Sequence, residues 1–436
     1  MICQQSGSTI LLTKPLIVVN MNLFVRVTNI LLFMLQPNPA ASKATTSQLK
    51  KHNESLILRE IYAHDTISRV RLAALTHLSR PSVTEITQGL LEKGLIVELG
   101  PESVQDKVGK KPTLLALNQD AYHIIAIVLT EATAIGSLLD LRMNTITQQI
   151  VPIQDLTAQR LINRLIDLIE VIQREVTYPL LGITVGIPGI INSETGFVHI
   201  TTYFEWNSVP LGKILSERFQ VPVYVGNDSN LAAVGEYRYG HGQDVKNLVV
   251  VVAGEGLGAG ILADGRIIGG HSLAAGEIGH MPIPQLDEIC LCGRRGCLET
   301  MVSWWGIKRH AQILAQQYPD SPLAQLTQDG CEISVAIIKK AITLGDTHIL
   351  ELVNQVAIYL GRALIMLIHL LNPKMIIITG SILELGDSFV AEVRKTVVDA
   401  THPYPVGDLE IIANRFDNQS ILLGAGAFLL EQELGL

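Results

Sequence analysis

Three cysteines and one histidine form the most specific chemical pattern in the chain. Cys290, Cys292 and Cys297 lie in the string CLCGRRGC, and His280 lies ten residues before the first of them. Three thiolates and one imidazole complete a tetrahedral zinc shell with no open position, which is typical of a structural ion. Free buried cysteines are the alternative, but three thiols within eight positions, with glycines among them, favour one structural Zn²⁺ ion per chain.

Polar side chains suited to sugar recognition surround this cluster in the sequence. A carboxylate accepts hydrogen bonds from two hydroxyls, and an aspartate can also take a proton from one. The residues of these types are Asn227, Asp228, Glu277 and Glu299. Taken singly, each type is more common at the surface or at a helix cap, so the residues alone leave both interpretations open.

A glycine-rich segment, GEGLGAG, runs from Gly254 to Gly260 directly after an apolar run. Loops of this kind can bring backbone N–H groups up to a phosphate. They serve turn geometry just as often, and Glu255 would repel a phosphate. The segment is therefore a weak signal for nucleotide binding.

Three short helical patterns follow one another between residues 47 and 93, on the N-terminal side of the metal-binding and sugar-binding candidates. Ser68 is placed to cap the second helix, and Pro81 falls in the first turn of the third, where its missing N–H costs nothing. The third helix is expected to bury Val83, Ile86, Leu90 and Leu91. Strands at 95–99 and 113–117 follow, with a polar loop at 100–112 between them.

This order of three helices and two strands predicts a winged helix-turn-helix domain. Short polar side chains at the start of the third helix would reach base edges in the major groove, and lysines of the wing or linker would contact phosphates or the minor groove. The expected DNA contacts are Arg80, Ser82, Thr84, Lys107, Lys110 and Lys111. A three-helix dimerisation module with a solvated, charged loop is the alternative.

The charge distribution fits two parts of different function. The chain of 436 residues carries 33 basic and 41 acidic side chains, a net charge of −8 that argues against a polyanion-binding surface as a whole. Residues 42–112, however, carry 11 basic and 8 acidic side chains (+3), whereas residues 113–436 carry 20 and 33 (−13). The DNA-binding candidate therefore has the opposite sign to the rest.

From residue 120 onward, runs rich in Val and Ile alternate with helical stretches, which predicts an α/β architecture. The expected strands are 123–129, 182–187, 222–225, 247–253 and 375–379, and the expected helices include 157–176 and 349–371. The apolar stretch 356–371 contains Arg362 and His369 and stops at Pro373, so we expect a buried core helix without stable membrane insertion.

The first 46 residues are expected to be a non-structural extension. Polar residues interrupt their apolar stretch before it reaches the roughly 18 residues of a membrane span, and no cleavage site follows. Translation starting at Met21 or Met34 is our hypothesis for this segment. The few, clustered cysteines favour a reducing compartment, so cytoplasmic localisation is expected.

Residues 183–303 resemble the ROK family of repressors, open reading frames and sugar kinases. The matching strings are GIPGIINSETGFVH, VPVYVGNDSNLAAVGE, GEGLGAGILADGRIIGG, AAGEIGHM and CLCGRRGCLE, and LNPKMIIITG and GAGAFLL extend the resemblance toward the C-terminus. The resemblance implies a two-lobed actin-like ATPase (ribonuclease-H-like) fold. The expected domains are the extension (1–46), the winged helix-turn-helix with linker (47–117), a first lobe (118–227) and a second lobe (228–436) with the zinc site and a C-terminal helix packed back on the first lobe.

The resemblance also implies roles for individual residues. The sugar hydroxyls would be contacted by Asn227, Asp228, Glu277, His280 and Glu299. His280 would in addition complete the zinc shell with Cys290, Cys292 and Cys297. In the family's kinases the residue matching Asp228 is the general base toward the sugar hydroxyl.

Two departures from the kinase pattern favour a regulator over an enzyme. Where the kinases carry an Asp-x-Gly-Gly-Thr phosphate loop, this chain has Val128-Leu129-Thr130-Glu131-Ala132-Thr133, and Glu255 replaces the threonine of the second phosphate loop. Without these phosphate contacts ATP use should fail, because phosphoryl transfer depends on positioning and charge neutralisation. The alternatives are a sugar kinase that keeps Asp228 as general base and a zinc-stabilised scaffold without DNA binding.

The added N-terminal domain resembles that of the family's transcriptional regulators. The expected partners are operator DNA, a sugar or sugar phosphate effector, and a second copy of the chain in a homodimer or a dimer of dimers. Two positions differ from the family: Lys110 stands where its linkers usually have arginine, and Tyr203 lies in the segment where its sugar binders often have Asn-Leu. Some repressors of the family respond to a sugar-transport protein, but Asn227 and Asp228 favour a small sugar here.

Overall fold

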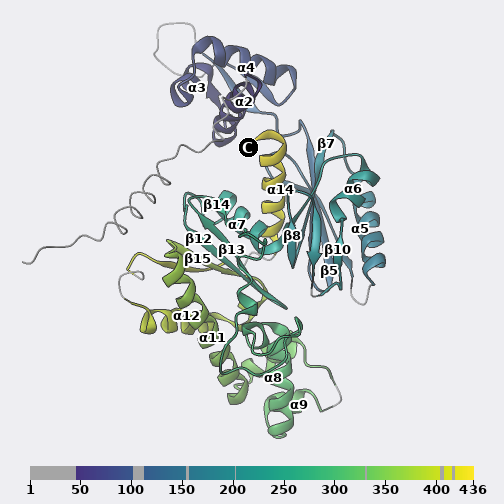
Figure 1. The fold of residues 1–436 in the computed structure, drawn as a ribbon, viewed down its shortest axis with the longest axis vertical. Helices are drawn as coiled ribbons and strands as arrows, with labels where there is room; N and C mark the ends of the chain where they lie inside the picture. The colour runs from purple at the N-terminus through teal and green to yellow at the C-terminus, as the bar shows by residue number, and fades with distance from the viewer. Residues whose placement is uncertain are drawn as a thin grey trace, which may run out of the picture. The chain divides into compact units, whose positions relative to one another are not determined.

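The computed structural model (Figure 1) describes residues 46–101, 112–153, 157–201, 203–328, 331–402, 407–414 and 418–436. The chain divides into two compact units, 1–53 and 54–436. Of the first unit, only the beginning of helix α2 is described. The expected extension up to residue 45, the hypothesis on the start of translation and the linker 102–111 all lie outside the described residues.

The N-terminal part of the described chain holds three helices and a three-stranded sheet of order β1-β3-β2. Ser68 caps α3 as expected, and Ser79 caps α4 by accepting a hydrogen bond from the Ser82 N–H. Ile86 and Leu91, expected in the core, are only half-buried. The elements are α2 (Thr46–Ala63), β1 (Ile67–Ser68), α3 (Arg69–Thr76), α4 (Arg80–Glu92), β2 (Ile96–Pro101) and β3 (Thr113–Leu117).

A five-stranded sheet of order β11-β7-β4-β5-β6 forms the first lobe. Every residue of β4 is buried, and alternate side chains contact different cores: Ile125 and Ile127 pack on the side of α5, and Ile124 and Val128 on the side of α14. The elements of this lobe are β4 (His123–Leu129), β5 (Thr133–Leu139), β6 (Thr145–Pro152), α5 (Ala158–Gln173), β7 (Leu180–Ile187), β8 (Ile190–Asn192), β9 (Phe197–Ile200), β10 (Asn207–Val209), α6 (Leu211–Phe219) and β11 (Val223–Asn227).

The second lobe repeats this arrangement with a sheet of order β14-β13-β12-β15-β16. Helix α11 is long and apolar enough to cross a membrane, but it is largely buried and packs on α12, as expected for a core helix. The elements are β12 (Leu248–Ala253), β13 (Leu257–Ala263), β14 (Arg266–Ile267), η1 (Ile278–His280), η2 (Leu298–Thr300), α8 (Trp304–Gln317), α9 (Pro322–Leu326), α10 (Val335–Thr343), α11 (Thr347–Leu371), β15 (Met375–Thr379), η3 (Ser381–Leu385), α12 (Asp387–Ala400) and β16 (Glu410–Asn414).

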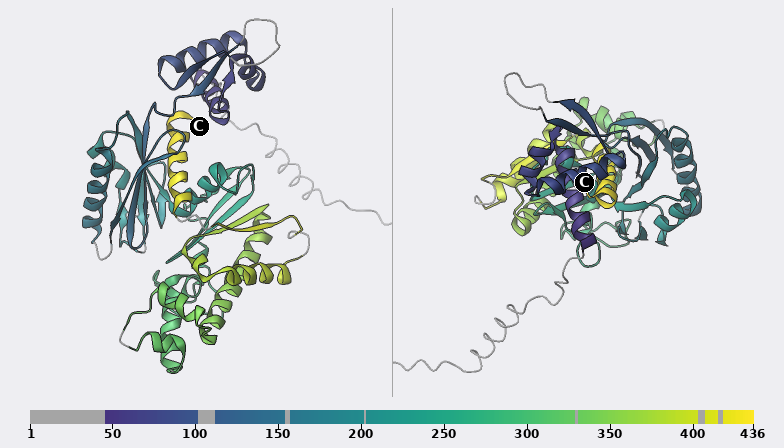
Figure 2. Two further views of the ribbon diagram at one scale, coloured as in Figure 1. Left: turned by 180° about the vertical axis from the view of Figure 1, so that it is seen from behind. Right: turned by 90° about the horizontal axis from the view of Figure 1, so that it is seen from above.

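Two helices join the lobes: α7 (Asp228–Tyr239) packs on β12 and β13, and α14 (Gln419–Leu434) packs on β4 and β7. Figures 1 and 2 show α14 against one face of the first sheet, with α5 and α6 on the other. The helices touch through glycines, since a Cβ on Gly235 would lie 1.9 Å from the Ser420 carbonyl oxygen and one on Gly424 1.8 Å from that of Leu231. The expected α/β class with two lobes is confirmed.

Candidate functional site

A cavity of about 330 Å³ opens where strands of both sheets end. The first lobe contributes the ends of β4 and β11 with the start of α7, and the second contributes the end of β12, the β12–β13 turn, η1 and η2. All five residues expected to contact sugar line it: Asn227, Asp228, Glu277, His280 and Glu299. Its size lies at the lower end of the roughly 300–1,000 Å³ found for small-molecule sites.

Asn227 and Asp228 form the junction between β11 and α7. The Asn227 side-chain oxygen accepts a hydrogen bond from the Asn230 N–H at 3.0 Å, and its Nδ2 donates to the Gly189 carbonyl oxygen at 3.0 Å. Asp228 Oδ1 accepts from the Ser229 N–H at 2.7 Å. These bonds fix both side chains at the helix N-terminus. Burial holds the pKa of Asp228 above its ordinary value.

Glu277 and Glu299 bring two more carboxylates into the cavity. Glu299 is buried, and its Oε2 accepts a hydrogen bond from the Leu257 N–H at 3.1 Å. Burial, assisted by the charges of Asp228 and Glu299, raises the pKa of Glu277 to about 7. The cavity therefore offers several hydrogen-bond acceptors in a partly dry site, which suits a ligand rich in hydroxyls.

The metal-binding candidates also come together. One ligand atom from each of His280, Cys290, Cys292 and Cys297 lies within 4.8 Å of the other three. The Sγ atoms of Cys292 and Cys297 are 3.7 Å apart, and Cys290 Sγ is 3.8 Å from His280 Nδ1. A tetrahedron with Zn–S bonds of about 2.3 Å has edges of about 3.8 Å, so these four groups fit a zinc ion.

The local backbone explains how so short a segment can supply three thiols. Gly293 and Gly296 adopt left-handed conformations, with φ of 83° and 73°. These residues turn the chain between Cys292 and Cys297, where a side chain would be strained. His280 presents Nδ1 to Cys290, whereas its Nε2 lies 3.8 Å from Glu277 Oε2. One ring nitrogen thus faces the metal cluster and the other faces the sugar-site carboxylate.

The positions of the two kinase phosphate loops form hairpin tips at the same cavity. Residues 128–133 are the end of β4 and a tight turn in which the Thr130 N–H donates to the Thr133 carbonyl oxygen at 2.8 Å. Glu131 and Glu255 both line the cavity. Glu255 forms an ion pair with Lys308 of α8 at 2.7 Å. No sequence pattern points to Lys308, which lies 53 residues further along the chain than Glu255.

The candidate DNA-binding residues lie on helix α4 or outside the described residues. Arg80 and Thr84 are exposed, and Ser82 is half-buried. The hydroxyls of Ser82 and Thr84 already form local bonds, with Ser79 Oγ at 2.8 Å and with the Arg80 carbonyl oxygen at 2.9 Å. Lys107, Lys110 and Lys111 lie outside the described residues.

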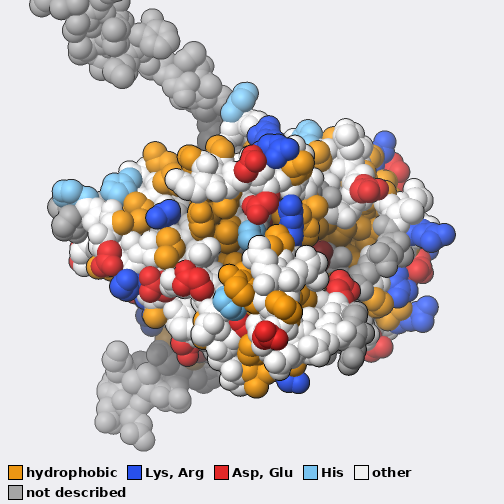
Figure 3. All heavy atoms as spheres, turned by 90° about the horizontal axis from the view of Figure 1, so that it is seen from below, with side chains coloured by type: hydrophobic (Ala, Val, Ile, Leu, Met, Phe, Trp, Pro, Cys, Tyr) orange, Lys and Arg blue, Asp and Glu red, His pale blue; other side chains and the backbone are white. Residues whose placement is uncertain are grey.

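Charge on the face of the molecule seen in Figure 3 is mixed. Lysine and arginine side chains are interspersed there with aspartate, glutamate and hydrophobic groups, without a continuous basic area. A polyanion would find no extended electrostatic footprint on this face. This agrees with the excess of acidic residues beyond residue 112.

Comparison with known proteins decides the family. The family model described as "ROK family" matches residues 126–432, which is more than half of the chain. The chain belongs to the ROK family. The matched range contains the whole cavity-lining set from Val128 to Ile421 and the four zinc-ligand candidates.

Two regulators are similar to this ROK chain over nearly its whole length. The xylose repressor of Caldicellulosiruptor bescii is 30% identical over 391 residues, covering 88% of this chain and 97% of the repressor. The DNA-binding transcriptional dual regulator NagC of Escherichia coli K12 is 29% identical over 400 residues, covering 91% and 96%. Because only 9% of this chain lies outside the second match, that match includes most of the N-terminal helical region.

A kinase and a solved regulator structure complete the comparison. The glucokinase of Halalkalibacterium halodurans is 34% identical over 255 residues, but this match covers only 58% of this chain. The crystal structure of a ROK family transcriptional regulator, described as a homolog of the E. coli MLC protein, has a TM-score of 0.77 at 28% identity and covers 88% of this chain and 96% of that one. The regulators therefore match the N-terminal helical region as well as the range that the family model matches.

Proposed function

We propose that this ROK chain is a sugar-responsive transcriptional regulator, and a repressor of carbohydrate uptake or catabolism genes. Operator DNA would bind through the winged helix-turn-helix, with α4 in the major groove, and a sugar would bind in the cavity. One observation carries the proposal: helix α7 begins at the cavity with Asp228 and ends with Tyr239 at helix α2 of the DNA-binding part. A single helix thus connects the proposed sugar cavity with the proposed DNA-binding domain.

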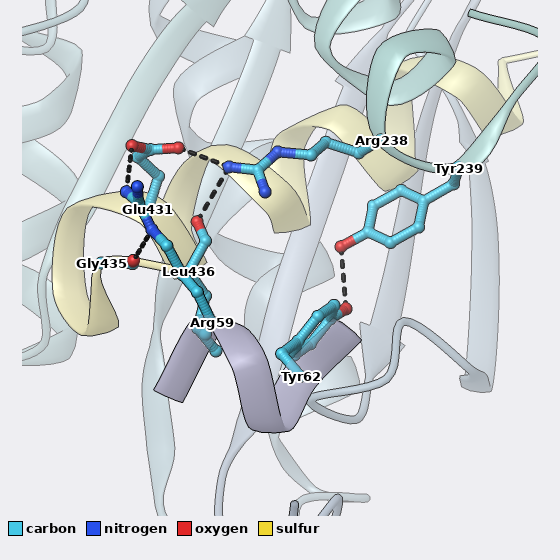
Figure 4. A network of polar contacts seen from close by, with 7 residues as sticks. All are labelled: Arg59, Tyr62, Arg238, Tyr239, Glu431, Gly435 and Leu436. Carbon is cyan, nitrogen blue, oxygen red and sulfur yellow. Dashed lines mark hydrogen bonds and ion pairs between the residues drawn. The ribbon is translucent and has the colours of Figure 1, made fainter. Parts of the chain in front are cut away.

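Two tyrosines form the first contact between α7 and α2 (Figure 4). The hydroxyls of Tyr62 and Tyr239 are hydrogen-bonded at 2.9 Å. Burial raises the pKa of both tyrosines, so their hydroxyls remain protonated well above physiological pH. Arg142 of the first lobe adds a bond to α2 beside this contact, because it donates to the Tyr62 carbonyl oxygen at 2.6 Å.

Glu431 of α14 forms the second contact, because it bridges two arginines (Figure 4). Arg59 of α2 donates to Glu431 Oε1 at 3.1 Å, and Arg238 of α7 donates to Oε2 at 2.5 Å. The same arginines bond the C-terminal backbone, Arg59 at the Gly435 carbonyl oxygen and Arg238 at that of Leu436. These are charge-assisted bonds between partly exposed side chains; they join α2 to α14 and α14 to α7.

Sugar binding would act through these contacts by shifting the lobes. A ligand changes an equilibrium only by its differential affinity for the two states, and coupling between sites is typically about 1–3 kcal/mol. Closure of the lobes on a sugar would move α7, and with it the anchor of α2. In a homodimer this would alter the spacing of two DNA-binding domains that read a palindromic operator.

We further propose one structural zinc ion per chain, held by His280, Cys290, Cys292 and Cys297. The ion would fix the η1 and η2 segments that supply Glu277 and Glu299 to the cavity. Its support is the fit of the four ligand atoms to a tetrahedron. A sugar-transport protein remains the alternative effector, and the presence of Asn227 and Asp228 in the cavity favours a small sugar.

The DNA-binding part of the proposal is tested by a gel shift with the intergenic DNA beside this protein's own gene. We expect retardation at low salt that weakens steeply as salt rises, because phosphate contacts release counterions. The Arg80→Ala variant should lose most of this affinity, whereas Arg160→Ala, in α5 of the first lobe, should retain it. If no fragment of operator size is retarded at low salt, the DNA-binding proposal is wrong.

A sugar kinase is the second candidate function, because Asp228 lies in the cavity and a glucokinase is similar over 255 residues. A coupled assay of ADP release with a panel of hexoses separates the two. A regulator without kinase activity should release no ADP. Sugar-dependent ADP release that Asp228→Asn abolishes would favour the kinase.

A further inference from the structure

The two hairpin tips occupy equivalent places in the two lobes. Strands β4 and β12 are each followed by an antiparallel partner, β5 or β13, and each also pairs in parallel with a neighbour, β7 or β15. Glu131 follows β4, Glu255 follows β12, and both line the same cavity. A ligand bound between the sheets therefore meets a carboxylate from each lobe.

The cavity lining is rich in carboxyl groups and poor in basic side chains. Its lining includes five carboxylates: Glu131, Asp228, Glu255, Glu277 and Glu299. Among the described lining residues there is no lysine or arginine. The nearby Lys308 already pairs with Glu255 at 2.7 Å. Phosphate sites in proteins rely on arginine, lysine or unpaired backbone N–H groups, and the first two are absent from this lining.

Backbone N–H groups at the hairpin tips are also engaged. In the β4–β5 turn the N–H groups of Ala132 and Thr133 donate to the Thr130 hydroxyl, at 3.3 and 3.0 Å. In the β12–β13 turn Gly254 N–H donates to the Gly256 carbonyl oxygen, and Leu257 N–H donates to Glu299. Of the N–H groups at these tips, those of Ala132, Thr133, Gly254 and Leu257 are thus engaged within the protein and are not offered to a phosphate.

The N-terminus of α7 also faces the cavity, and side chains of the protein already accept hydrogen bonds from its first N–H groups. Its first N–H groups donate to the side chains at the junction, Ser229 N–H to Asp228 Oδ1 and Asn230 N–H to Asn227 Oδ1. A helix N-terminus attracts an anion through such N–H groups and through its dipole. Here the Asp228 carboxylate occupies that position.

We infer that the effector of this cavity is an unphosphorylated sugar, and that Glu131 and Glu255 exclude sugar phosphates. The inference rests on the proposed function and narrows its effector. A neutral sugar can donate hydroxyl hydrogens to carboxyl oxygens of this lining, whereas a phosphate dianion would find no lysine or arginine among the lining residues to pair with. The two glutamates that stand at the positions of the kinase phosphate loops would therefore also discriminate between free and phosphorylated sugars.

Isothermal titration calorimetry of the zinc-loaded, full-length protein tests the inference with pairs of ligands. The pairs are glucose and glucose 6-phosphate, N-acetylglucosamine and its 6-phosphate, and xylose and xylose 5-phosphate. We expect at least one free sugar to bind, and its phosphate ester to bind at least about tenfold more weakly. A phosphate ester that binds as tightly as its free sugar would overturn the inference and leave the proposed regulation intact.

Two variants test whether Glu131 and Glu255 cause the discrimination between free and phosphorylated sugars. Glu131→Gln removes one charge and leaves the Lys308–Glu255 pair in place, whereas Glu255→Gln also releases Lys308. Both variants should reduce the difference in Kd between the free sugar and its phosphate ester, and Glu255→Gln should reduce it more. Glu217→Gln, on the exposed surface of α6, removes the same charge and should leave the difference unchanged. A difference that persists in the Glu131→Gln/Glu255→Gln double variant would contradict the assignment.

A protein that binds no sugar would contradict the proposed function, and exclusion of phosphate is then tested with a different ligand. If no sugar binds in either form, the small-sugar proposal is wrong, and Mg·ADP then serves as the phosphate probe. Binding of Mg·ADP gained only in the double variant would support exclusion by Glu131 and Glu255. Binding by the wild-type protein, or by neither protein, would overturn it.

Discussion

The Tyr62 hydroxyl lies 2.9 Å from the Tyr239 hydroxyl, and Tyr239 ends the helix that Asp228 begins. One end of α7 is therefore bonded to α2 of the proposed DNA-binding part, and the other carries a carboxylate of the candidate sugar cavity. Helix α14 supports this connection because Gly235 and Gly424 let its backbone approach α7 closely. The communication that we propose between sugar and operator depends on this helix pair.

Tyr239→Phe should weaken communication while leaving both sites intact. The variant removes one hydrogen bond between half-buried tyrosines, which contributes about 1 kcal/mol, and it alters no residue of the cavity or of α4. We expect unchanged sugar affinity by calorimetry and a smaller effect of sugar on operator affinity by fluorescence anisotropy. Tyr318→Phe, an exposed tyrosine of the second lobe, is the matched control and should behave as wild type.

Gly424→Ala should destabilise the protein. A Cβ at this position would lie 1.8 Å from the Leu231 carbonyl oxygen, so α7 and α14 would have to separate. Such overpacking costs about 1–3 kcal/mol, and urea denaturation should show it. Gly89→Ala, on α4 with open space around it, should not lower stability. Equal stability of both variants would mean that the two helices are not in close contact.

Removal of the proposed metal should affect the second lobe first. Metal analysis of the denatured protein should give about one zinc per chain, and Cys292→Ser should lower this content and unfold the second lobe more than the DNA-binding part. Hydrogen exchange resolves the two regions. The exposed Cys331→Ser is the control and should keep full zinc content. A zinc-free wild-type protein with the same stability would contradict a structural ion.

Sugar affinity should fall as the pH is lowered from 8 to 5. Burial holds the pKa of Asp228 above its ordinary value, and burial with the neighbouring charges raises that of Glu277 to about 7. Each carboxylate therefore takes up a proton at a higher pH than an exposed one, and it then loses acceptor capacity for hydroxyls. Calorimetry across this range should show the decline, and Asp228→Asn should bind weakly at every pH. Affinity that rises toward pH 5 would contradict these roles.

Elements with strong local patterns could be predicted from the sequence. Strands β3, β4 and β15 have the expected bounds, because their apolar runs are short, rich in β-branched residues or leucine, and bordered by polar or turn residues. The Cys-rich segment stands out because its three cysteines are nearly contiguous, whereas the expected roles of Asn227 and Asp228 depend on the resemblance to the ROK family. Ser68 could be recognised as a cap, since the capping signal is local.

Contacts between distant residues could not be predicted. Lys308 reaches Glu255 across 53 residues, and Tyr62 reaches Tyr239 across 177, and neither pair has a pattern that points to its partner. Strand β1, with only Ile67 and Ser68, is too short to show a period of two and forms because β3 lies beside it. The half-burial of Ile86 likewise depends on packing that helical periodicity does not specify.

A sugar bound in the cavity should change the affinity of this protein for its operator. The most direct test is fluorescence anisotropy with a labelled fragment retarded in the gel shift, titrated with protein with and without each free sugar that binds. We predict that at least one free sugar changes the Kd for this DNA by about fivefold or more, the lower limit of typical allosteric coupling. An operator Kd that stays the same at saturating concentrations of every sugar that the protein binds would contradict the account.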